Sequence, residues 1–284
     1  MVIKNEGGYS SYDEKQVYVT ALTNENYIPG VMALVRSLKK VATTHEIIIL
    51  VPTSAYQFLL KKITDYGILY FSGVNVLSSD DLLLPDELNE QEHFWTNTFF
   101  KLKAFSLEQF SKVILIDSDM LVQKNIDCLF EKEHMSAVVA GKCLNPEWCD
   151  LNSGLVVFVP NVDLYKKLVL TIPFTYMRKK LEGAATGDQD VIHDVFPEWR
   201  YNQQLHLDEK YNMFWSCLIF YCTTHRCKLR SIPVVHFIGA KKPWSYGFKN
   251  IFIDFFSSIK HLNLMKFNQN LMLVKYILLT KRKM

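Results

Sequence analysis

One short segment limits the fold of this chain more than any other. It runs from Val113 to Asp119, where four apolar residues end in Asp117, Ser118 and Asp119. The apolar run is too short and too β-branched for a helix, so we expect a buried strand whose carboxyl end opens into a loop. Ligand sites in open α/β sheets lie at that end of the strands. The segment therefore predicts a ligand site that contains two carboxylates.

The spacing of Asp117 and Asp119 favours a metal site. Side chains at positions i and i+2 face the same side, so both carboxylates can bind one hard cation such as Mg²⁺ or Mn²⁺ and leave places for phosphate oxygens. In a second interpretation, the two acids cap a helix that follows the strand. The segment by itself leaves both interpretations open.

Strand-like and helix-like segments alternate along the chain. We predict strands at 17–22, 47–51, 69–76, 113–116, 155–159 and 234–237, and helices at 29–41, 52–67 and 98–110. This alternation predicts a single α/β, Rossmann-like domain with a mostly parallel central sheet and helices on both faces. The turn from Thr23 to Asn26 is not a glycine-rich phosphate loop, which argues against nicotinamide-dinucleotide and P-loop enzymes.

The composition is that of a globular protein. The 284 residues are 49% hydrophobic and 21% charged, enough for one large α/β domain or two small ones. Residues 1–16 form a polar N-terminal segment without the apolar core of a signal peptide. The chain has no run of about 18 apolar residues, so no transmembrane helix is expected. We therefore expect a cytoplasmic protein.

The six cysteines contain no CxxC pair and lie in or beside apolar segments. This pattern predicts reduced thiols, as in cytosolic proteins. A zinc site is a second interpretation for Cys217, Cys222, His225 and Cys227, although their spacings match no common zinc module.

The C-terminal segment 246–284 is basic and contains regularly spaced apolar residues. From Lys241 to the C-terminus there are nine Lys or Arg and one Asp, a net charge of +8; the whole chain carries +3, which leaves −5 for residues 1–240. We favour an amphipathic helical tail that covers the domain and turns its lysines outward. A peripheral contact with an anionic membrane or a protein is the second interpretation. The acidic main body argues against nucleic-acid binding.

Six motifs occur in an order and spacing that fit one known family. They are Val19–Asn24 with Tyr27 and Gly30, Lys101–Leu102, Asp117–Asp119, Asn152–Gly154, Gly187–Gln189, and His236–Gly239 followed by Lys242–Trp244. Together they resemble glycosyltransferase family 8, the glycogenin-like retaining transferases, over about residues 17–245. The resemblance implies a nucleotide-sugar-binding domain of GT-A type. It also implies transfer of a hexose from UDP-glucose or UDP-galactose to a hydroxyl acceptor.

The resemblance further implies which residues meet the charged part of the donor. Asp117, Asp119 and His236 would hold a Mn²⁺ ion against the donor pyrophosphate. Lys242 would reach the same pyrophosphate as a point charge, and Lys101 would meet a donor phosphate or the sugar.

Nucleotide and sugar recognition are implied at other positions. The nucleotide-binding residues would be Leu22, Thr23, Asn24, Tyr27, Ser118 and Gly239. Residues 22–24 would meet the uracil edge, Tyr27 would stack on the uracil face, and Ser118 would touch the ribose. Asn152 and Asp188 would bind the transferred sugar, and Gln189 would lie near its anomeric carbon.

Several of these residues also have a purely structural interpretation. His236 can be a core histidine with one hydrogen bond, and Thr23 and Asn24 can cap the next helix. Asn152 can form a turn, and Asp188 can be a first-turn acid favoured by the helix dipole. On the sequence alone, these interpretations stand beside the functional ones.

The mechanism and the acceptor are left open by the sequence. Retention can proceed through a covalent glycosyl-enzyme or through front-face attack, and we favour the latter. Glycogenin-like proteins often have an Asp where this chain has Ala185, which puts in doubt either a double-displacement role or self-glucosylation of the glycogenin type. The acceptor can be a glycan, a protein or, as in galactinol-synthase-like relatives, a small polyol. A homodimer is also compatible with the family.

Two other classes of protein compete with a glycosyltransferase. A haloacid-dehalogenase-like phosphatase also places two aspartates after a strand, but near the start of its domain, whereas at least three predicted elements precede Asp117 here. A non-catalytic sugar-nucleotide-binding protein could keep every binding residue without turnover.

Overall fold

The computed structural model describes residues 15–82, 84, 97–245 and 263–281. Most of the predicted polar N-terminal segment, and residues 246–262 and 282–284 of the predicted tail, lie outside the described residues. The described strands are β1 (Gln16–Ala21), β2 (Glu46–Pro52), β3 (Val74–Ser79), β4 (Lys112–Ile116), β5 (Met120–Val122), β6 (Ser136–Val138), β7 (Asn152–Phe158), β8 (His206–Leu207), β9 (Met213–Phe214) and β10 (Val234–His236). The described α-helices are α1 (Ile28–Lys40), α2 (Tyr56–Asp65), α5 (Val162–Leu181), α6 (Asp188–Val195), α7 (Leu218–Thr224) and α9 (Leu264–Thr280).

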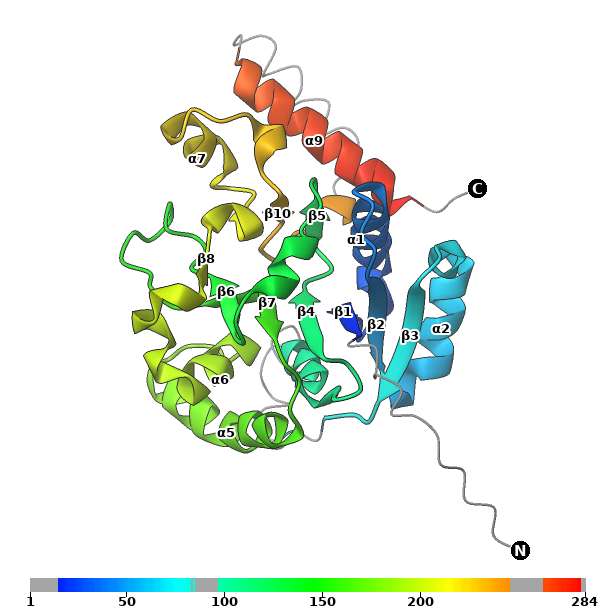
Figure 1. Ribbon diagram of the computed structural model, residues 1–284, viewed down its shortest axis with the longest axis vertical. Coiled ribbons are helices and arrows are strands. Elements are labelled where there is room, and N and C mark those ends of the chain that lie inside the picture. Colours follow the sequence, from blue (N-terminus) through cyan, green and yellow to red (C-terminus); the bar gives the residue numbers. More distant parts are fainter. Residues whose placement is uncertain (1–14, 83, 85–96, 246–262, 282–284) are drawn as a thin grey trace, which may run out of the picture.

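A seven-stranded sheet forms the centre of the molecule (Figure 1). Its strand order is β3-β2-β1-β4-β7-β6-β8, and the first four strands are parallel. β7 runs antiparallel to both β4 and β6, and β8 runs parallel to β6. The sheet is therefore mostly parallel, as the strand-helix alternation predicts.

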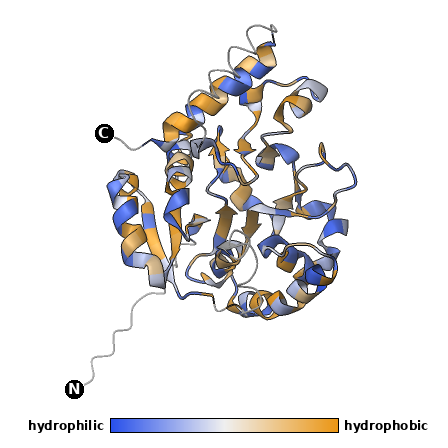
Figure 2. Cartoon of the chain, turned by 180° about the vertical axis from the view of Figure 1, so that it is seen from behind, coloured by the Kyte–Doolittle hydropathy of each residue, from blue (hydrophilic) through white to orange (hydrophobic). Residues whose placement is uncertain are grey.

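Apolar side chains on both faces of the sheet are buried. Along β1, Tyr18 belongs to the core that contains α1, α2 and α9, whereas Val17 and Val19 belong to the core that contains α5 and α6. Successive side chains of a strand point to opposite faces, so one strand contributes to both cores. Figure 2 shows the central strands as mostly hydrophobic, which is typical of a sheet covered on both faces.

A second sheet of three strands, in the order β5-β10-β9, stands beyond the carboxyl end of β4. β5 follows β4 after a three-residue turn and pairs antiparallel with β10, so that His236 is opposite Met120. The amide of Phe237 also donates to the Asp119 carbonyl at 3.0 Å. This small sheet brings residues far apart in the chain to the end of β4.

Three predicted elements differ from those observed. The third strand lies at Val74–Ser79 rather than 69–76, because Gly67 and Gly73 adopt positive φ and enclose a 3₁₀ turn before the strand begins. Residues 97–106 form a 3₁₀ segment rather than an α-helix. Most of the apolar side chains of this segment are buried, so it lacks the single apolar face of an amphipathic α-helix. Asn152–Gly154 begins β7 instead of forming a turn before it.

The expected helical C-terminal tail is present as α9, which packs against α1 (Figure 1). Tyr276 and Ile277 are buried, whereas Lys266 and Lys275 are exposed. Arg36 of α1 donates to carbonyls at the end of α9. The described part of the tail thus covers the domain with its lysines outward. Within the described part of the chain, no helix combines the length and apolarity needed to cross a membrane.

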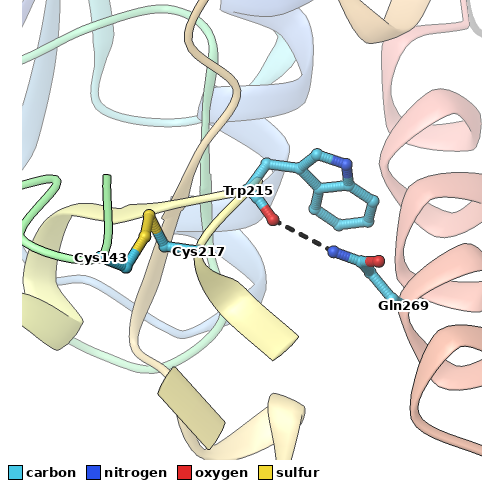
Figure 3. The surroundings of a disulfide bond; sticks show 4 residues. All are labelled: Cys143, Trp215, Cys217 and Gln269. Atoms are coloured by element: carbon cyan, nitrogen blue, oxygen red, sulfur yellow. Dashed lines mark hydrogen bonds between the residues drawn. A yellow bond between two sulfur atoms is a disulfide. The ribbon is translucent and has the colours of Figure 1, made fainter. Parts of the chain in front are cut away.

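The prediction that all six cysteines are reduced thiols is wrong in this structure. Cys143 and Cys217 form a disulfide (Figure 3), across 74 residues of sequence. Only tertiary folding brings the loop after β6 beside the start of α7, so spacing along the chain gives no indication of this pair. The disulfide occupies one ligand of the suggested zinc site, and among the described residues no metal-like group forms around Cys222, His225 and Cys227. The zinc interpretation therefore fails.

Candidate active site

Asp117 and Asp119 lie in the turn that joins β4 to β5. The amide of Asp117 donates to the Gly154 carbonyl of β7 at 2.9 Å, and its carbonyl accepts from the Met120 amide at 3.2 Å. The Asp119 side chain is 9% exposed, whereas that of Asp117 is 29% exposed. The turn thus holds the Asp119 carboxylate in the protein interior and leaves the Asp117 carboxylate partly exposed.

His236 completes a group of three side chains suited to a metal ion. Its Nε2 lies 3.2 Å from Asp119 Oδ1 and 3.9 Å from Asp117 Oδ2. One ligand atom from each residue lies within 4.8 Å of the other two. Ligands about 2.0–2.6 Å from one cation can be no further apart than about twice that distance. The three residues therefore fit a divalent cation that accepts mixed oxygen and nitrogen ligands.

Two buried lysines pair with the carboxylates. Lys101 Nζ lies 3.1 Å from Asp117 Oδ1, 2.9 Å from Asp188 Oδ2 and 3.1 Å from the Ser153 hydroxyl. Lys242 Nζ lies 2.6 Å from Asp119 Oδ2. Three carboxylates thus meet two ammonium groups, which leaves an excess of negative charge that a cation can balance.

The two aspartates have pKa shifts of opposite sign. Burial alone would raise the pKa of Asp119, but His236 and Lys242 together hold it well below its ordinary value. Burial raises the pKa of Asp117, and the neighbouring Asp119 adds to that rise against the opposing effect of Lys101. Burial would lower the pKa of Lys101, but the carboxylates of Asp117 and Asp188 raise it above its ordinary value.

A cleft of about 320 Å³ opens beside the carboxylates. Eight of the residues predicted from the sequence line it, namely Thr23, Asn24, Tyr27, Lys101, Asp117, Ser118, Asp119 and Lys242. Ala21, Asn26 and Thr98 also line it and were not predicted. The cleft lies at the carboxyl ends of β1 and β4, where a parallel sheet places its ligands.

The remaining predicted residues are not among those that line this cleft. The Asp188 carboxylate forms an ion pair with Lys101, which lines the cleft. Helix α6 begins at Asp188, directly after Gly187, as expected. The Leu22 side chain is fully buried, and its amide donates to the Leu50 carbonyl. Gly239 lies in the loop after β10 with a φ of +99°.

A row of hydrogen bonds through Asn212 joins His236 to Asn152 and Gln189. The sequence did not predict Asn212 as a site residue. Asn212 Oδ1 lies 2.8 Å from His236 Nδ1, and its Nδ2 donates to Asn152 Oδ1 at 2.8 Å. Asn152 Nδ2 in turn donates to Gln189 Oε1 at 3.0 Å. No motif singles out Asn212; its only sequence clue is an amide just before the short apolar strand β9.

Two glycines allow other residues to come close to the site. A Cβ at Gly154 would lie 2.6 Å from His236 Cε1, and a Cβ at Gly30 would lie 2.6 Å from the Trp244 ring. Trp244 also donates to the Asn26 carbonyl at 3.0 Å and packs edge-on against Tyr27. The loop after β10 is thereby held against the cleft.

The fold is that of GT-A glycosyltransferases, as comparison with solved structures shows. The glycosyltransferase GlyE of Streptococcus pneumoniae TIGR4 has a TM-score of 0.55 at 20% identity, covering 83% of this chain and 57% of that one. The galactosyltransferase LgtC, crystallised with donor and acceptor sugar analogs, has a TM-score of 0.56 at 14% identity, covering 80% of this chain and 89% of that one. At these identities the likeness concerns the fold alone.

The chain belongs to glycosyl transferase family 8, whose family model matches residues 18–247. Glycogenin-1 of Homo sapiens is 32% identical over 238 residues, which cover 82% of this chain and 63% of that protein. Glycogenin-1 of Caenorhabditis elegans is 32% identical and covers 81% and 51% of the two chains. Inositol phosphorylceramide glucuronosyltransferase 1 of Arabidopsis thaliana is 26% identical over 198 residues, 69% of this chain and 33% of that protein. The chain thus spans less than two thirds of these relatives.

Proposed function

We propose that this protein is a metal-dependent retaining glycosyltransferase that moves glucose or galactose from a UDP-sugar to a hydroxyl acceptor. The observation that carries the proposal is the group of Asp117, Asp119 and His236 beside the cleft of a family 8 chain. The relatives named as glycogenins and as a glucuronosyltransferase support transfer of a sugar. The metal group favours such an enzyme over a protein that only binds a sugar nucleotide.

The metal assigned to the three side chains is Mn²⁺, because mixed carboxylate and imidazole ligation suits it better than Ca²⁺. When bound, the ion would supply positive charge to the donor pyrophosphate and to the departing UDP. Lys242, which pairs with Asp119 beside the same cleft, would add a second positive charge toward the phosphates. The site then presents several positive charges where the leaving group develops negative charge.

The proposed nucleotide site is the part of the cleft at the end of β1. Thr23, Asn24 and Tyr27 line it, and we assign to them the uracil edge and face. Burial, followed by the carboxylates of Asp119 and Asp117, raises the pKa of Tyr27 to about 12. Its ring therefore stays neutral at physiological pH and can stack on a base. Ser118 is assigned to the ribose, and the backbone of residues 22 and 239 to further nucleotide contacts.

The proposed sugar site lies toward Asp188, Asn152 and Gln189. The Gln189 Oε1 atom accepts hydrogen bonds from Asn152 and from the Ser153 amide. Its Nε2 atom has no partner among the described residues and can donate to a sugar. The Asp188 carboxylate is held by Lys101, so we assign it to binding sugar hydroxyls rather than to nucleophilic attack. This arrangement favours front-face attack, in which the acceptor hydroxyl enters as UDP leaves.

The proposal is tested by incubating the protein with Mn²⁺ and a panel of UDP-sugars, followed by measurement of UDP release and of the intact protein mass. We expect Mn²⁺-dependent UDP release with UDP-glucose or UDP-galactose. The Asp119→Asn variant should lose at least about 10³-fold of this activity, as expected for loss of a metal ligand. Asp163→Asn, which replaces a carboxylate exposed on α5, is the matched control and should retain full activity.

The same experiment separates the acceptors. A mass increase in hexose steps means that the protein glycosylates itself, whereas UDP release that depends on an added polyol means transfer to a small acceptor. Donor binding without UDP release, with every sugar and acceptor, would contradict the proposal and favour a non-catalytic binding protein.

A further inference from the structure

Asn212 is a fully buried amide that none of the proposed binding roles uses. It precedes β9, and both ends of its side chain are hydrogen-bonded. One end faces His236 in the metal group, and the other faces Asn152 in the proposed sugar site. Asn212 therefore joins the two halves of the site, although it does not line the cleft itself.

Two backbone amides decide which way each side-chain amide in this row points. The Gly154 amide donates to Asn152 at 3.0 Å, and the Ser153 amide donates to Gln189 at 3.2 Å. A backbone N–H can only donate, so the atom that it meets in each side chain must be oxygen. This places the Asn152 oxygen toward Gly154 and its NH₂ group toward the Gln189 oxygen.

The same logic then reaches His236. The Asn152 oxygen faces Asn212, so Asn212 must present its NH₂ group to Asn152 and its oxygen to the imidazole. An amide oxygen only accepts, so His236 must donate from Nδ1. In the neutral ring the lone pair is then on Nε2, the nitrogen that faces Asp119 and Asp117.

We propose that Asn212 is a positioning residue that sets the tautomer of His236 for metal binding. It also fixes the position of the imidazole ring relative to Asn152 and Gln189 through the row of hydrogen bonds. The tautomer matters because a nitrogen that ligates a metal must be unprotonated. This part of the inference rests on the proposed function, in which His236 is a metal ligand. Histidines that ligate a metal generally donate their other N–H to such an acceptor, and loss of that acceptor typically weakens metal binding about 10- to 100-fold.

The test uses two variants of Asn212. Asn212→Leu removes both hydrogen bonds while keeping the same branched side-chain shape, although the leucine is larger. Asn212→Asp keeps an oxygen acceptor for His236 Nδ1 but cannot donate to Asn152. We expect Asn212→Leu to weaken Mn²⁺ binding about 10- to 100-fold, and Asn212→Asp to restore it to within about 3-fold of the unmodified protein. A role in packing alone would not distinguish the two in this way.

Two measurements independent of turnover apply. Mn²⁺ affinity is measured by electron paramagnetic resonance of the free ion. The tautomer is measured on the metal-free protein by long-range ¹H–¹⁵N spectra with ¹⁵N-histidine, at a pH where the ring is neutral, with His236→Gln identifying the signal. We expect the Nδ1–H form in the unmodified protein and in Asn212→Asp, and its loss in Asn212→Leu.

Gln123→Leu is the matched control. Gln123 also uses its amide within the three-stranded sheet region, donating to the Leu229 and Ile232 carbonyls, but at the end away from His236. Its loss should leave the tautomer and the Mn²⁺ affinity unchanged while the circular dichroism shows a folded protein. An Nε2–H tautomer in the unmodified protein would overturn the inference, as would an Asn212→Leu variant with unchanged tautomer and affinity. Absence of Mn²⁺ binding to the unmodified protein would instead contradict the proposed function, and the tautomer measurement would still test Asn212.

Discussion

Two lysine–carboxylate clusters meet at the metal group, and they differ in balance. The Lys101 cluster contains two carboxylates, Asp117 and Asp188, around one ammonium group. The Lys242 cluster contains one carboxylate, Asp119, between the ammonium group and His236. The Lys101 cluster therefore carries the excess negative charge, whereas the Lys242 cluster is already compensated.

The difference explains why two aspartates only two positions apart have opposite pKa shifts. Asp119 is stabilised as a carboxylate by its two partners, so its pKa is lowered. The pKa of Asp117 is raised first by burial and then by the neighbouring carboxylates of Asp119 and Asp188, which outweigh the opposing effect of the Lys101 that it shares with Asp188. Asp119 is thus a carboxylate whose charge is already balanced, whereas the neighbouring Asp117 is a carboxylate whose charge is not. Burial without full compensation is a common property of functional carboxylates.

The largest expected difference between the clusters is in the stability of the metal-free protein. Asp119→Asn should lower the free energy of unfolding by about 3 kcal/mol, because it leaves the buried Lys242 without its carboxylate. Asp117→Asn should leave the free energy of unfolding unchanged or raise it, since it removes a poorly compensated charge. Urea unfolding without metal measures both. Equal losses in the two variants would mean that the clusters are equally balanced.

Replacement of the two lysines should give a smaller difference of the same kind. Lys101→Met leaves Asp117 and Asp188 near each other without a cation, whereas Lys242→Met leaves Asp119 with His236 as a partner. We expect Lys101→Met to be the more destabilising by about 1–2 kcal/mol in thermal or urea unfolding. Added Mn²⁺ should reduce this gap, because a cation replaces the missing charge. A greater loss in Lys242→Met would reverse the assignment of the excess charge.

The smallest expected effect is in the pH dependence of stability. Asp119 has a lowered pKa, so the stability that it contributes is present above its ordinary pKa and is lost as the pH falls through the lowered value. Asp117 has a raised pKa, so above its ordinary value of 3.8 the folded state retains a proton that the unfolded state releases. Its contribution therefore declines as the pH rises from 3.8 toward the raised value.

Comparison of the unmodified protein with Asp117→Asn isolates this second effect. The difference in their free energies of unfolding should shift in favour of the variant as the pH is raised above 3.8. Urea unfolding at a series of pH values without metal measures it. A constant difference over that range would show that the pKa of Asp117 is the same in the folded and unfolded states.

Local patterns predicted much of the fold and part of the site. The β-branched run before Asp117 forms β4, and Gly187 precedes the helix that begins at Asp188. These features depend on neighbours in the chain, because strand burial and helix starts are decided within a few residues. Of the eight predicted residues that line the cleft, Thr23, Asn24 and residues 117–119 meet there because they follow the carboxyl ends of the neighbouring parallel strands β1 and β4.

Other features depend on contacts between distant segments and could not be predicted. The Cys143–Cys217 disulfide joins segments 74 residues apart. Asn212 has no periodicity or motif that indicates its bonds to Asn152 and His236. The 3₁₀ segment at 97–106 forms where aromatic side chains are buried in the core that contains α5 and α6, although the local periodicity predicts an α-helix.

The sequence by itself determined the chemical inventory of the site: two carboxylates at the end of a buried strand, a histidine, two lysines and the motifs of a family 8 chain. Only the tertiary structure decided how their charges are shared. Pairing of β5 with β10 places His236 and Lys242 on Asp119, while the 97–106 segment and the start of α6 place Lys101 between Asp117 and Asp188. The interaction between charged side chains depends on their distance and their burial, and neither quantity can be read from the order of the residues along the chain.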